Sequence, residues 1–533
     1  MQLFCNASSL YMQKHIANPV NAVPIYKQKV LLLIFLISTV RLIVAFTIGL
    51  GNDESYYWFY SEHLKFNYFD HPPMVALWIR IFTLNLSLQN FPGFIRLGSV
   101  VGCALSTWFM YKCVSQLSSE RTGWFAACLY NASFYAGITA GIFIMPDSPQ
   151  MVFLTWSMWM IAKLTADDSK ILNWILVGIS AGLCIMSKVH GVFIWIGIGL
   201  YVLFYKRAWL AKPWLYVAIL ISILISLPIL FWNIKYNFIT YTFDSRRINV
   251  YGFAINFRSF LTQFVQQIFI NNPFNFILIV LALFSWKKYE FKKMPALKIY
   301  NLIGLPLAFL LLYISLYRDD TLAHWSGPAY IALIPVAAIR LSEISKKILW
   351  PKMMNASLLM HVLFLALCSL FILYYPGDFG KTKPPYRGIN DLTVDNYGWK
   401  QAGEQFDSLY ENDKRNGTIT KATPVVCYKW WGAHQEYYFC RPLNIQMIGL
   451  GGIINLHEYL WMNTLRKDKV DLSKAYCIVP SDEFYNAKKM YENFYSQIDL
   501  IKNISIIRSG KPAIDFYIYR LSGWKNNLPL IKN

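Results

Sequence analysis

Long apolar runs recur along the first 375 positions of the chain, and each is close to the length that crosses a lipid bilayer. A helix needs about 20 apolar residues to span the hydrocarbon core. The first run follows a polar leader at residues 1–26 and precedes no small-residue cleavage site, so we interpret it as an uncleaved signal-anchor. The pattern predicts about eleven spans. They are expected at 29–50, 92–115, 123–143, 147–166, 171–188, 190–205, 214–232, 264–285, 299–317, 326–341 and 353–375.

Beyond residue 375 the pattern changes to short runs of alternating apolar residues, which are typical of half-buried strands. Such runs lie at 423–431, 436–440, 475–480, 504–509 and 515–521, with helix-like segments at 399–411, 456–467 and 481–497. The sequence therefore predicts a polytopic α-helical membrane protein with a C-terminal extracytoplasmic α/β domain. The expected divisions are an N-terminal segment (1–28), a membrane domain (29–375) whose first outer loop is 51–91, and a soluble domain (376–533).

Composition supports a membrane protein with anionic partners. Only 15% of the residues are charged, against roughly 25% in soluble domains. The formal net charge is nevertheless +21, which favours nucleic acid, anionic lipid or a phosphate-bearing substrate. Because no soluble basic segment with interleaved aromatic residues is visible, we do not expect nucleic acid as a partner.

The distribution of positive charge between loops predicts the orientation of the chain. One alternating set of loops holds roughly twice as many Lys and Arg as the other, and the richer set is expected in the cytoplasm. This puts the N-terminus inside and the C-terminal domain outside. The stretch 74–88 is then an amphipathic helix in the interface, because a further span there would invert the charge bias.

On this map the unusual polar residues gather in the outer loops, whereas the inner loops hold little besides Lys and Arg. A polar rim on one face of a membrane bundle is typical of an enzyme that works at the outer leaflet. The candidate site residues are Asp53, Glu54, Asp70, His71, Asp147, Lys188, His190, Arg246, Arg247 and His324.

Each candidate has a chemical and a structural interpretation. Asp53 beside Glu54 suits a general base near the membrane surface, or a solvated loop. Asp147 is an acid at membrane depth, where charges are costly and usually functional, but it also suits a helix N-cap. Lys188 in a tight apolar turn suggests an anion partner, or snorkelling to the headgroups. Arg246 and Arg247 suit a phosphate, or ordinary anionic lipid.

These pieces together resemble the C-type, lipid-carrier-dependent glycosyltransferases. The sequence is similar to the protein O-mannosyltransferase superfamily and to the bacterial lipid A aminoarabinose transferases. The matching motifs are the Asp53-Glu54 pair, FDHPP at 69–73, PDSP at 146–149, SKVHG at 187–191 and HWSGPAYIALIP at 324–335. Eukaryotic protein mannosyltransferases carry a large lumenal insert that this chain lacks, so the resemblance does not imply protein mannosylation.

The resemblance implies transfer of a sugar, with inversion, from a polyprenyl-phosphate donor to a glycolipid, glycan or protein acceptor. Asp53 would be the base, while Glu54, Asp70 and Asp147 would line the acceptor and sugar pocket. Cationic candidates would neutralise the phosphate of the departing lipid, namely His71, Lys188, Arg246 and Arg247. The resemblance also implies that the protein lies in a bacterial cytoplasmic membrane.

The main rival function is a transporter or flippase of a lipid-linked sugar, although no internal repeat is visible. No metal site or cofactor is expected. The acidic pair could nevertheless hold a divalent cation beside a phosphate. In the soluble domain, Cys427 and Cys440 lie in neighbouring strand-like runs and could form a disulfide, with Cys477 as an alternative partner.

Overall fold

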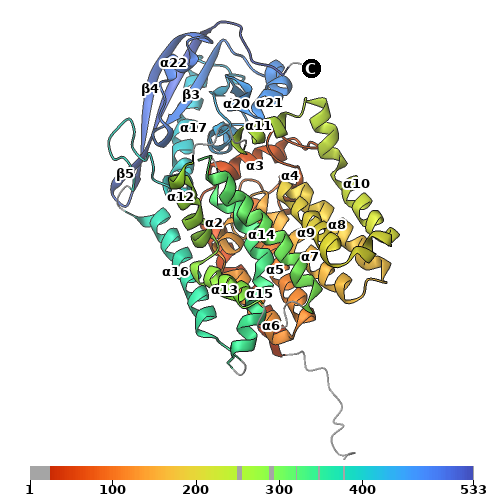
Figure 1. Cartoon of the computed structure of the whole chain (residues 1–533). Coiled ribbons are helices and arrows are strands. Elements are labelled where there is room, and N and C mark those ends of the chain that lie inside the picture. The colour runs from red at the N-terminus through yellow and green to blue at the C-terminus, as the bar shows by residue number, and fades with distance from the viewer. Residues whose placement is uncertain are drawn as a thin grey trace, which may run out of the picture.

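The computed structural model describes residues 25–248, 255–286, 293–319, 321–345, 348–375 and 379–531. Most of the expected N-terminal segment therefore lies outside the described residues. Figure 1 shows a bundle of helices with a C-terminal part, residues 379–531, seated on one end of it. We refer to these two regions as the helical bundle and the C-terminal part.

Six described helices are long and apolar enough to cross a membrane, and they make the chain an integral membrane protein. A seventh span results if one bent pair of helices is counted as a single span. The length and composition of the described helices therefore do not establish the eleven spans predicted from the sequence. The six are α2 (Ile25–Thr47), α5 (Pro92–Leu117), α10 (Pro213–Lys235), α14 (Pro295–Ser315), the stretch Ala323–Ser345 that contains α15 (Gly327–Ser345), and α16 (Lys352–Tyr374).

Most of the remaining predicted spans correspond to helices that are shorter or less apolar than these six. They are α6 (Glu120–Ala132) followed by the π-helix η1 (Tyr135–Thr139), α7 (Asp147–Ala166), α8 (Ile171–Ser187), and α9 (Phe193–Tyr205) preceded by the 3-10 helix η2 (Val189–Val192). A further 3-10 helix, η3 (Arg207–Ala211), links α9 to α10. The stretch 171–205 is therefore two helices joined by a tight turn, as the sequence predicts.

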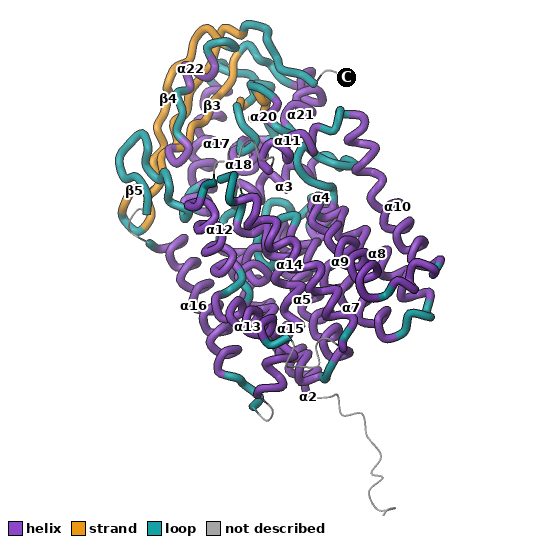
Figure 2. Tube along the Cα trace, viewed as in Figure 1, coloured by secondary structure: helices purple, strands orange, loops and turns teal. Residues whose placement is uncertain are grey.

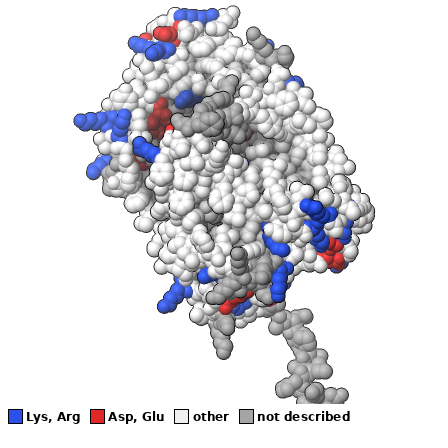
Figure 3. Space-filling model, viewed as in Figure 1, with Lys and Arg blue, Asp and Glu red and all other residues white. Residues whose placement is uncertain are grey.

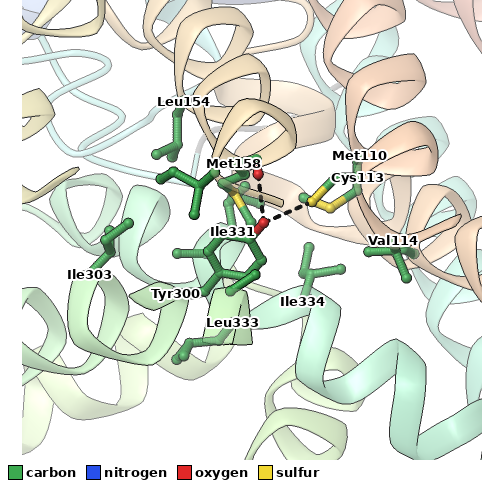
Figure 4. Packing of buried hydrophobic residues seen from close by; sticks show 14 of the residues in the cluster. Met110, Cys113, Val114, Leu154, Met158, Tyr300, Ile303, Ile331, Leu333 and Ile334 are labelled. Carbon is green, nitrogen blue, oxygen red and sulfur yellow. Dashed lines mark hydrogen bonds between the residues drawn. The ribbon is translucent and has the colours of Figure 1, made fainter. Parts of the chain in front are cut away.

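Burial differs sharply between the inner and outer helices of the bundle. In its most apolar window α15 is 78% buried, whereas α2 and α16 are 17% buried. Because lipid is an apolar solvent, the outer helices can expose Leu and Phe without cost. In the core, the Tyr300 hydroxyl donates to the Met158 carbonyl at 2.5 Å and contacts the Cys113 thiol at 3.2 Å (Figure 4).

One predicted span is broken. Instead of a straight helix over 264–285, the structure has α12 (Phe257–Ile270) and α13 (Pro273–Phe284), which meet at 100°. Asn272 between them has a positive φ of 67°, and its side chain caps α13 by accepting from the Phe274 amide. Pro273 occupies the first turn of α13, where its missing N–H is not needed. These local features turn the chain, and the apolar pattern does not reveal them.

Two helices lie between α2 and α5. They are α3 (Asn52–Glu62) and α4 (Met74–Phe82), and α4 corresponds to the amphipathic helix expected in 74–88. It ends early because Leu84, Asn85 and Leu86 all have positive φ. One more helix in this layer, α11 (Ile239–Ile248), follows α10.

The C-terminal part holds a five-stranded mixed sheet in the order β2-β1-β3-β5-β4. β1 pairs in parallel with β2 and β3, while β5 pairs antiparallel with β3 and β4. The strands are β1 (Val425–Cys427), β2 (Met447–Gly449), β3 (Lys474–Pro480), β4 (Tyr495–Arg508) and β5 (Lys511–Trp524). The helices around it are α17 (Trp399–Arg415), α18 (Gly432–Gln435), α19 (Arg441–Leu443), α20 (Ile453–Leu456), α21 (Tyr459–Arg466) and α22 (Ala487–Tyr491).

Most predicted strands are confirmed, but the segment 436–440 is not a strand. It forms a π-helix, η7 (Glu436–Cys440), whereas β1 and β3 to β5 lie at predicted strand positions and β2 is an additional strand. Figure 2 shows the long strands β3, β4 and β5 side by side in the C-terminal part. All five η7 residues are buried, so the run has no polar face from which its periodicity could be read. The predicted helix 481–497 shrinks to α22, and β4 begins within it.

The expected pairing of Cys427 with Cys440 is wrong, because it relied on that false strand. All eight cysteines among the described residues are free thiols. Burial raises the pKa of the Cys477 thiol to about 12, so this buried thiol is un-ionised and unreactive at neutral pH.

Charged side chains gather near the two ends of the molecule, and the surface between them carries few (Figure 3). A band of uncharged surface around a helical bundle is typical of a protein surrounded by lipid.

Candidate active site

The first turn of α3 presents Asp53 and Glu54 in opposite ways. The Asp53 side chain is exposed, whereas Glu54 is 3% exposed. The backbone amide of Gly51 donates to Glu54 Oε2 at 3.1 Å, which closes the start of the helix. Because the two residues are neighbours on a helix, their side chains point about 100° apart, so one faces the core and the other faces solvent.

Glu54 is held by a buried arginine. Arg96 Nε donates to Glu54 Oε1 at 2.7 Å, and the Arg96 Nη2 atom lies 2.5 Å from Glu54 Oε2. Arg96 also donates to the carbonyls of Ile48 and Gly49, at the end of α2. The Ile144 amide adds a further bond to Glu54 Oε1, at 3.1 Å. Both Glu54 oxygens are thus occupied, and they join the end of α2, α3, α5 and the segment before α7.

Three residues after Ile144, Asp147 forms a buried ion pair with Lys188. The Lys188 Nζ atom lies 2.8 Å from Asp147 Oδ2 and 3.0 Å from Oδ1, and the Tyr135 hydroxyl donates to Oδ1 at 2.7 Å. Asp147 begins α7 and Lys188 follows the end of α8. The anion partner expected for Lys188 is therefore a side chain of the same protein.

Two histidines lie beside this ion pair. The imidazole of His190, in η2, lies 6.3 Å from the ring of Trp325. Its neighbour His324, in the 3-10 helix η5 (Ala323–Ser326), is close enough to Asp147 for electrostatic interaction. Four of the sequence candidates are thus brought together here, from three separate segments of the chain. They are Asp147, Lys188, His190 and His324.

Asp70 and His71 occupy a second position, against the C-terminal part. The Tyr60 hydroxyl donates to Asp70 Oδ1, and His457 Nδ1 lies 3.9 Å from Asp70 Oδ2. The His71 ring lies 5.6 Å from that of Tyr57. The loop between α3 and α4 is therefore fixed by residues that precede α21, which no local pattern in the sequence indicates.

The C-terminal part also clamps the segment that leads into α3. The Tyr438 hydroxyl accepts from the Leu50 amide at 2.6 Å, and His434 bonds the Leu50 carbonyl at 2.8 Å. Asp395 Oδ1 accepts from the Asn52 amide at 3.1 Å. A β-carbon at Gly51 would lie 2.4 Å from Asp395 Oδ2, so only glycine allows this close approach.

Asp395 brings a third carboxylate to the Asp53-Glu54 turn. The pKa of Asp395 is raised to about 7, mainly by burial and also by the charges of Asp53 and Glu54. Asp482 lies beyond it, with a pKa raised to about 8 by burial and by Asp395. Sequence reasoning missed both residues, because they follow the last span by many positions and belong to no recognisable motif.

Two cavities flank the site. The larger one, of about 560 Å³, lies between α10, α11 and the C-terminal part, and aromatic and isoleucine side chains make up most of its lining. Phe69, Phe243 and Trp461 line it, with Lys235 as its cation. The smaller one, of about 290 Å³, lies at α12 and contains Arg258.

Lys235 and Arg258, which lie on either side of Arg246 and Arg247 in the sequence, thus line two different cavities. Arg246 and Arg247 lie in the last turn of α11, but their side chains fall outside the described residues. No group of three or more His, Cys, Asp or Glu side chains suited to a metal ion occurs among the residues that the structure describes.

Comparison with known proteins confirms the resemblance inferred from the motifs. The family model for dolichyl-phosphate-mannose-protein mannosyltransferase matches residues 70–232. Lipid A galacturonosyltransferase RgtD of Rhizobium johnstonii is 25% identical over 307 residues, which are 57% of this chain and 62% of that protein. The undecaprenyl phosphate-alpha-4-amino-4-deoxy-L-arabinose arabinosyl transferase 2 of Proteus mirabilis is 29% identical over 32% of each chain. The chain therefore matches less than two thirds of the length of either relative.

The fold has a solved counterpart. The crystal structure of ArnT from Cupriavidus metallidurans bound to undecaprenyl phosphate superposes with a TM-score of 0.58, over 92% of this chain and 97% of that one, at 12% identity. Such low identity supports the architecture alone. Together with the matches above, it supports the C-type glycosyltransferase superfamily as the class that this fold resembles.

Proposed function

We propose that the chain is a membrane glycosyltransferase that moves a sugar from a polyprenyl-phosphate donor to an acceptor. The observation that carries this proposal is the Glu54–Arg96 pair. By bonding the Ile144 amide, Glu54 ties the Asp53 turn to the Asp147 turn. An exposed carboxylate and a buried ion pair with two histidines then share one site, bordered by a large aromatic cavity.

In this proposal Asp53 is the general base. An acceptor hydroxyl attacks the anomeric carbon of the donor sugar, and Asp53 takes the hydroxyl proton as the new glycosidic bond forms. The bond between the anomeric carbon and the phosphate oxygen breaks, and the lipid phosphate leaves with the electron pair. A single displacement inverts the anomeric configuration. Glu54 is assigned a positioning role, since both its oxygens are already bonded.

The phosphate must meet positive charge as it departs. Because Lys188 is neutralised by Asp147, we assign less of this role to Lys188 than the sequence suggested. His71, Arg246 and Arg247 remain the proposed phosphate partners, and Lys235 in the aromatic cavity joins them. A polyprenyl chain would suit the apolar lining of that cavity. No metal is required by this scheme.

The proposed setting is a bacterial cytoplasmic membrane crossed by about eleven spans, with residues 376–533 as an extracytoplasmic domain over the site. The excess of Lys and Arg in one set of loops supports this orientation. The acceptor is a glycolipid, glycan or protein. Transport of a lipid-linked sugar is not favoured, since both curated relatives are named as transferases.

The test is sugar transfer by purified full-length protein from a radiolabelled undecaprenyl-phosphate sugar to envelope extract. Asp53→Asn keeps the side-chain size but removes the base, so transfer should fall by about 10²–10⁴-fold, while donor binding is retained. Asp499→Asn, an exposed carboxylate on β4, is the matched control and should remain active. A fully active Asp53→Asn variant would refute the assignment of the base. Movement of labelled lipid across a bilayer without transfer would favour a transporter.

A further inference from the structure

Helix α12 buries two of its polar residues, Gln263 and Gln267, while Arg258, Thr262 and Gln266 are exposed. Its outer face exposes Phe257, Leu261 and Phe269, at 65%, 50% and 54%. The opposite face buries Gln263 and Gln267, one helical turn apart, at 1% and 0%. A helix surrounded by lipid can expose apolar residues freely, but buried polar groups there need partners. The partners of the two glutamines therefore indicate whether their role is structural.

The carboxamides of Gln263 and Gln267 use only their oxygens. The Tyr330 hydroxyl donates to Gln267 Oε1 at 2.9 Å, and the Thr321 hydroxyl donates to Gln263 Oε1 at 3.5 Å. Neither Nε2 atom donates to any acceptor within the described part of the chain. A buried amide donor without an acceptor is destabilising, and most such groups in proteins are paired.

The asparagines at the adjacent bend show what a structural role looks like in this region. Asn272 Nδ2 donates to the carbonyls of Ala132 and Ser357, both at 2.9 Å. Asn275 Nδ2 donates to the Leu129 carbonyl at 2.7 Å, and its oxygen accepts from the Ser357 hydroxyl. In Asn272 and Asn275 both the nitrogen and the oxygen of the carboxamide have partners on other groups, whereas in the glutamines of α12 the nitrogen has none among the described residues.

Gln263 lines the smaller cavity, which we call the carboxamide pocket. Its volume is about 290 Å³, and its other walls include Arg258, Ser259, Gln266, Asp319 and Thr321. The lining thus offers amides, hydroxyls and charges of both signs, with no aromatic side chain among them. A ligand suited to such walls is compact and carries many hydroxyl groups, as a sugar ring does.

The carboxamide pocket connects to the candidate active site through a short stretch of chain. Thr321 borders the pocket, and η5 follows directly with His324 and Trp325. His324 interacts with Asp147, and Trp325 faces His190. A ligand in the pocket would therefore lie close to the Asp147–Lys188 ion pair and its two histidines in the candidate active site.

We propose that the carboxamide pocket binds the sugar of a glycolipid substrate and selects among sugars, with Gln263 Nε2 donating to a sugar oxygen. Gln267, one turn along the helix, holds a second unused donor but is not among the residues that line the pocket. This inference rests on the proposed function and specifies where its sugar specificity originates. The sugar can belong to the donor or to the acceptor, and the experiment separates the two.

The experiment uses full-length protein in nanodiscs and the nearly isosteric variants Gln263→Met and Gln267→Met. The probes are undecaprenyl phosphate alone and undecaprenyl phosphate that carries a neutral hexose, a hexuronic acid or an aminopentose. We expect Gln263→Met to weaken binding of the preferred sugar-bearing carrier about three- to tenfold, the worth of one hydrogen bond. Affinity for the bare carrier should not change. The control is Gln401→Met, at an exposed position on α17.

If the pocket serves the acceptor, donor affinities stay unchanged and the KM for acceptor extract rises by the same factor. Either result supports the proposal. Because the lost Nε2 atom has no acceptor within the described residues, and the lost Oε1 atom accepts only the long 3.5 Å bond from Thr321, the unfolding temperature of Gln263→Met should stay close to that of the wild type. Unchanged donor affinities together with an unchanged acceptor KM would overturn the inference, as would a fall in unfolding temperature alone.

Failure of the proposed function gives a different result. Wild-type protein that binds sugar-bearing carriers selectively through Gln263 but transfers no sugar would refute the transferase and retain the pocket. Wild-type protein that transfers sugar, with Gln263→Met indistinguishable from it in affinity and KM, would refute the pocket and retain the transferase.

Discussion

The Nζ atom of Lys188 lies 2.8 Å from Oδ2 of Asp147, although 41 residues separate them in the chain. The Lys188 and Asp147 side chains are 4% and 0% exposed, respectively. Burying an isolated charge here would cost much free energy, and each of the two side chains offsets that cost for the other.

The first prediction concerns this ion pair. Lys188→Met leaves the Asp147 carboxylate buried without a cation, and it should lower the free energy of unfolding by about 3–5 kcal/mol. The double variant Asp147→Asn with Lys188→Met should recover much of that loss, because no net buried charge remains. Thermal unfolding of the purified variants in detergent measures both effects. Equal destabilisation in the single and double variants would contradict the pairing.

A second prediction separates the roles of the two neighbouring acids. Glu54→Gln leaves Arg96 as an uncompensated buried cation and should cost about 3–5 kcal/mol of stability. Asp53→Asn changes an exposed side chain and should shift stability by less than about 0.5 kcal/mol. The comparison uses unfolding temperatures measured at one pH and one lipid-to-protein ratio. If Asp53→Asn is the less stable variant, our assignment of positioning and catalytic roles is reversed.

The third prediction is a pH dependence of stability that arises at Asp395. Its folded-state pKa of about 7 lies above the ordinary value of 3.8, so the folded protein binds more protons than the unfolded chain between these values. Stability should therefore fall as the pH rises through this range. Asp395→Asn removes the titrating group and should flatten the profile measured by denaturant unfolding between pH 4.5 and 8.

Part of that pH dependence should persist in the Asp395→Asn variant. The pKa of Asp482 is raised from 3.8 to about 8, mainly by burial, so its own contribution also lowers stability as the pH rises, over the whole range up to about pH 8. Asp499→Asn on the exposed edge strand β4 serves as the control and should retain the wild-type slope. A slope identical in wild type and Asp395→Asn would show that Asp395 does not titrate near neutrality.

The fourth prediction concerns orientation. Lys421 in the C-terminal part and Arg207 in η3 are both exposed, and the charge bias places them on opposite sides of the membrane. A membrane-impermeant maleimide should label Lys421→Cys in intact spheroplasts, and it should label Arg207→Cys only after permeabilisation. The described native cysteines are buried or half-buried, which keeps the background low. The reverse labelling pattern would invert the topology.

The chain sequence alone was sufficient to predict the apolar helices and most strands. Hydrophobic periodicity is a local property, so the ranges of α5, α7 and β3 follow from short stretches of sequence. The sequence also singled out Asp53, Asp147 and Lys188, because charged residues are rare beside apolar runs. It failed at Glu436–Cys440, where every side chain is buried and no polar face marks the periodicity.

Which residues are partners was decided only by the tertiary structure. The Glu54–Arg96 pair, the Asp147–Lys188 pair and the contact of Asp395 with Asn52 span 42, 41 and 343 residues. No local propensity encodes such contacts, because they form only when packing brings distant helix ends together and excludes water from them. The same packing changed the interpretation of Lys188 from a phosphate ligand to the partner of a buried acid. It also turned the unremarkable Gln263 into a candidate for sugar recognition, since a carboxamide on a lipid-facing helix is informative only once its bonding partners are known.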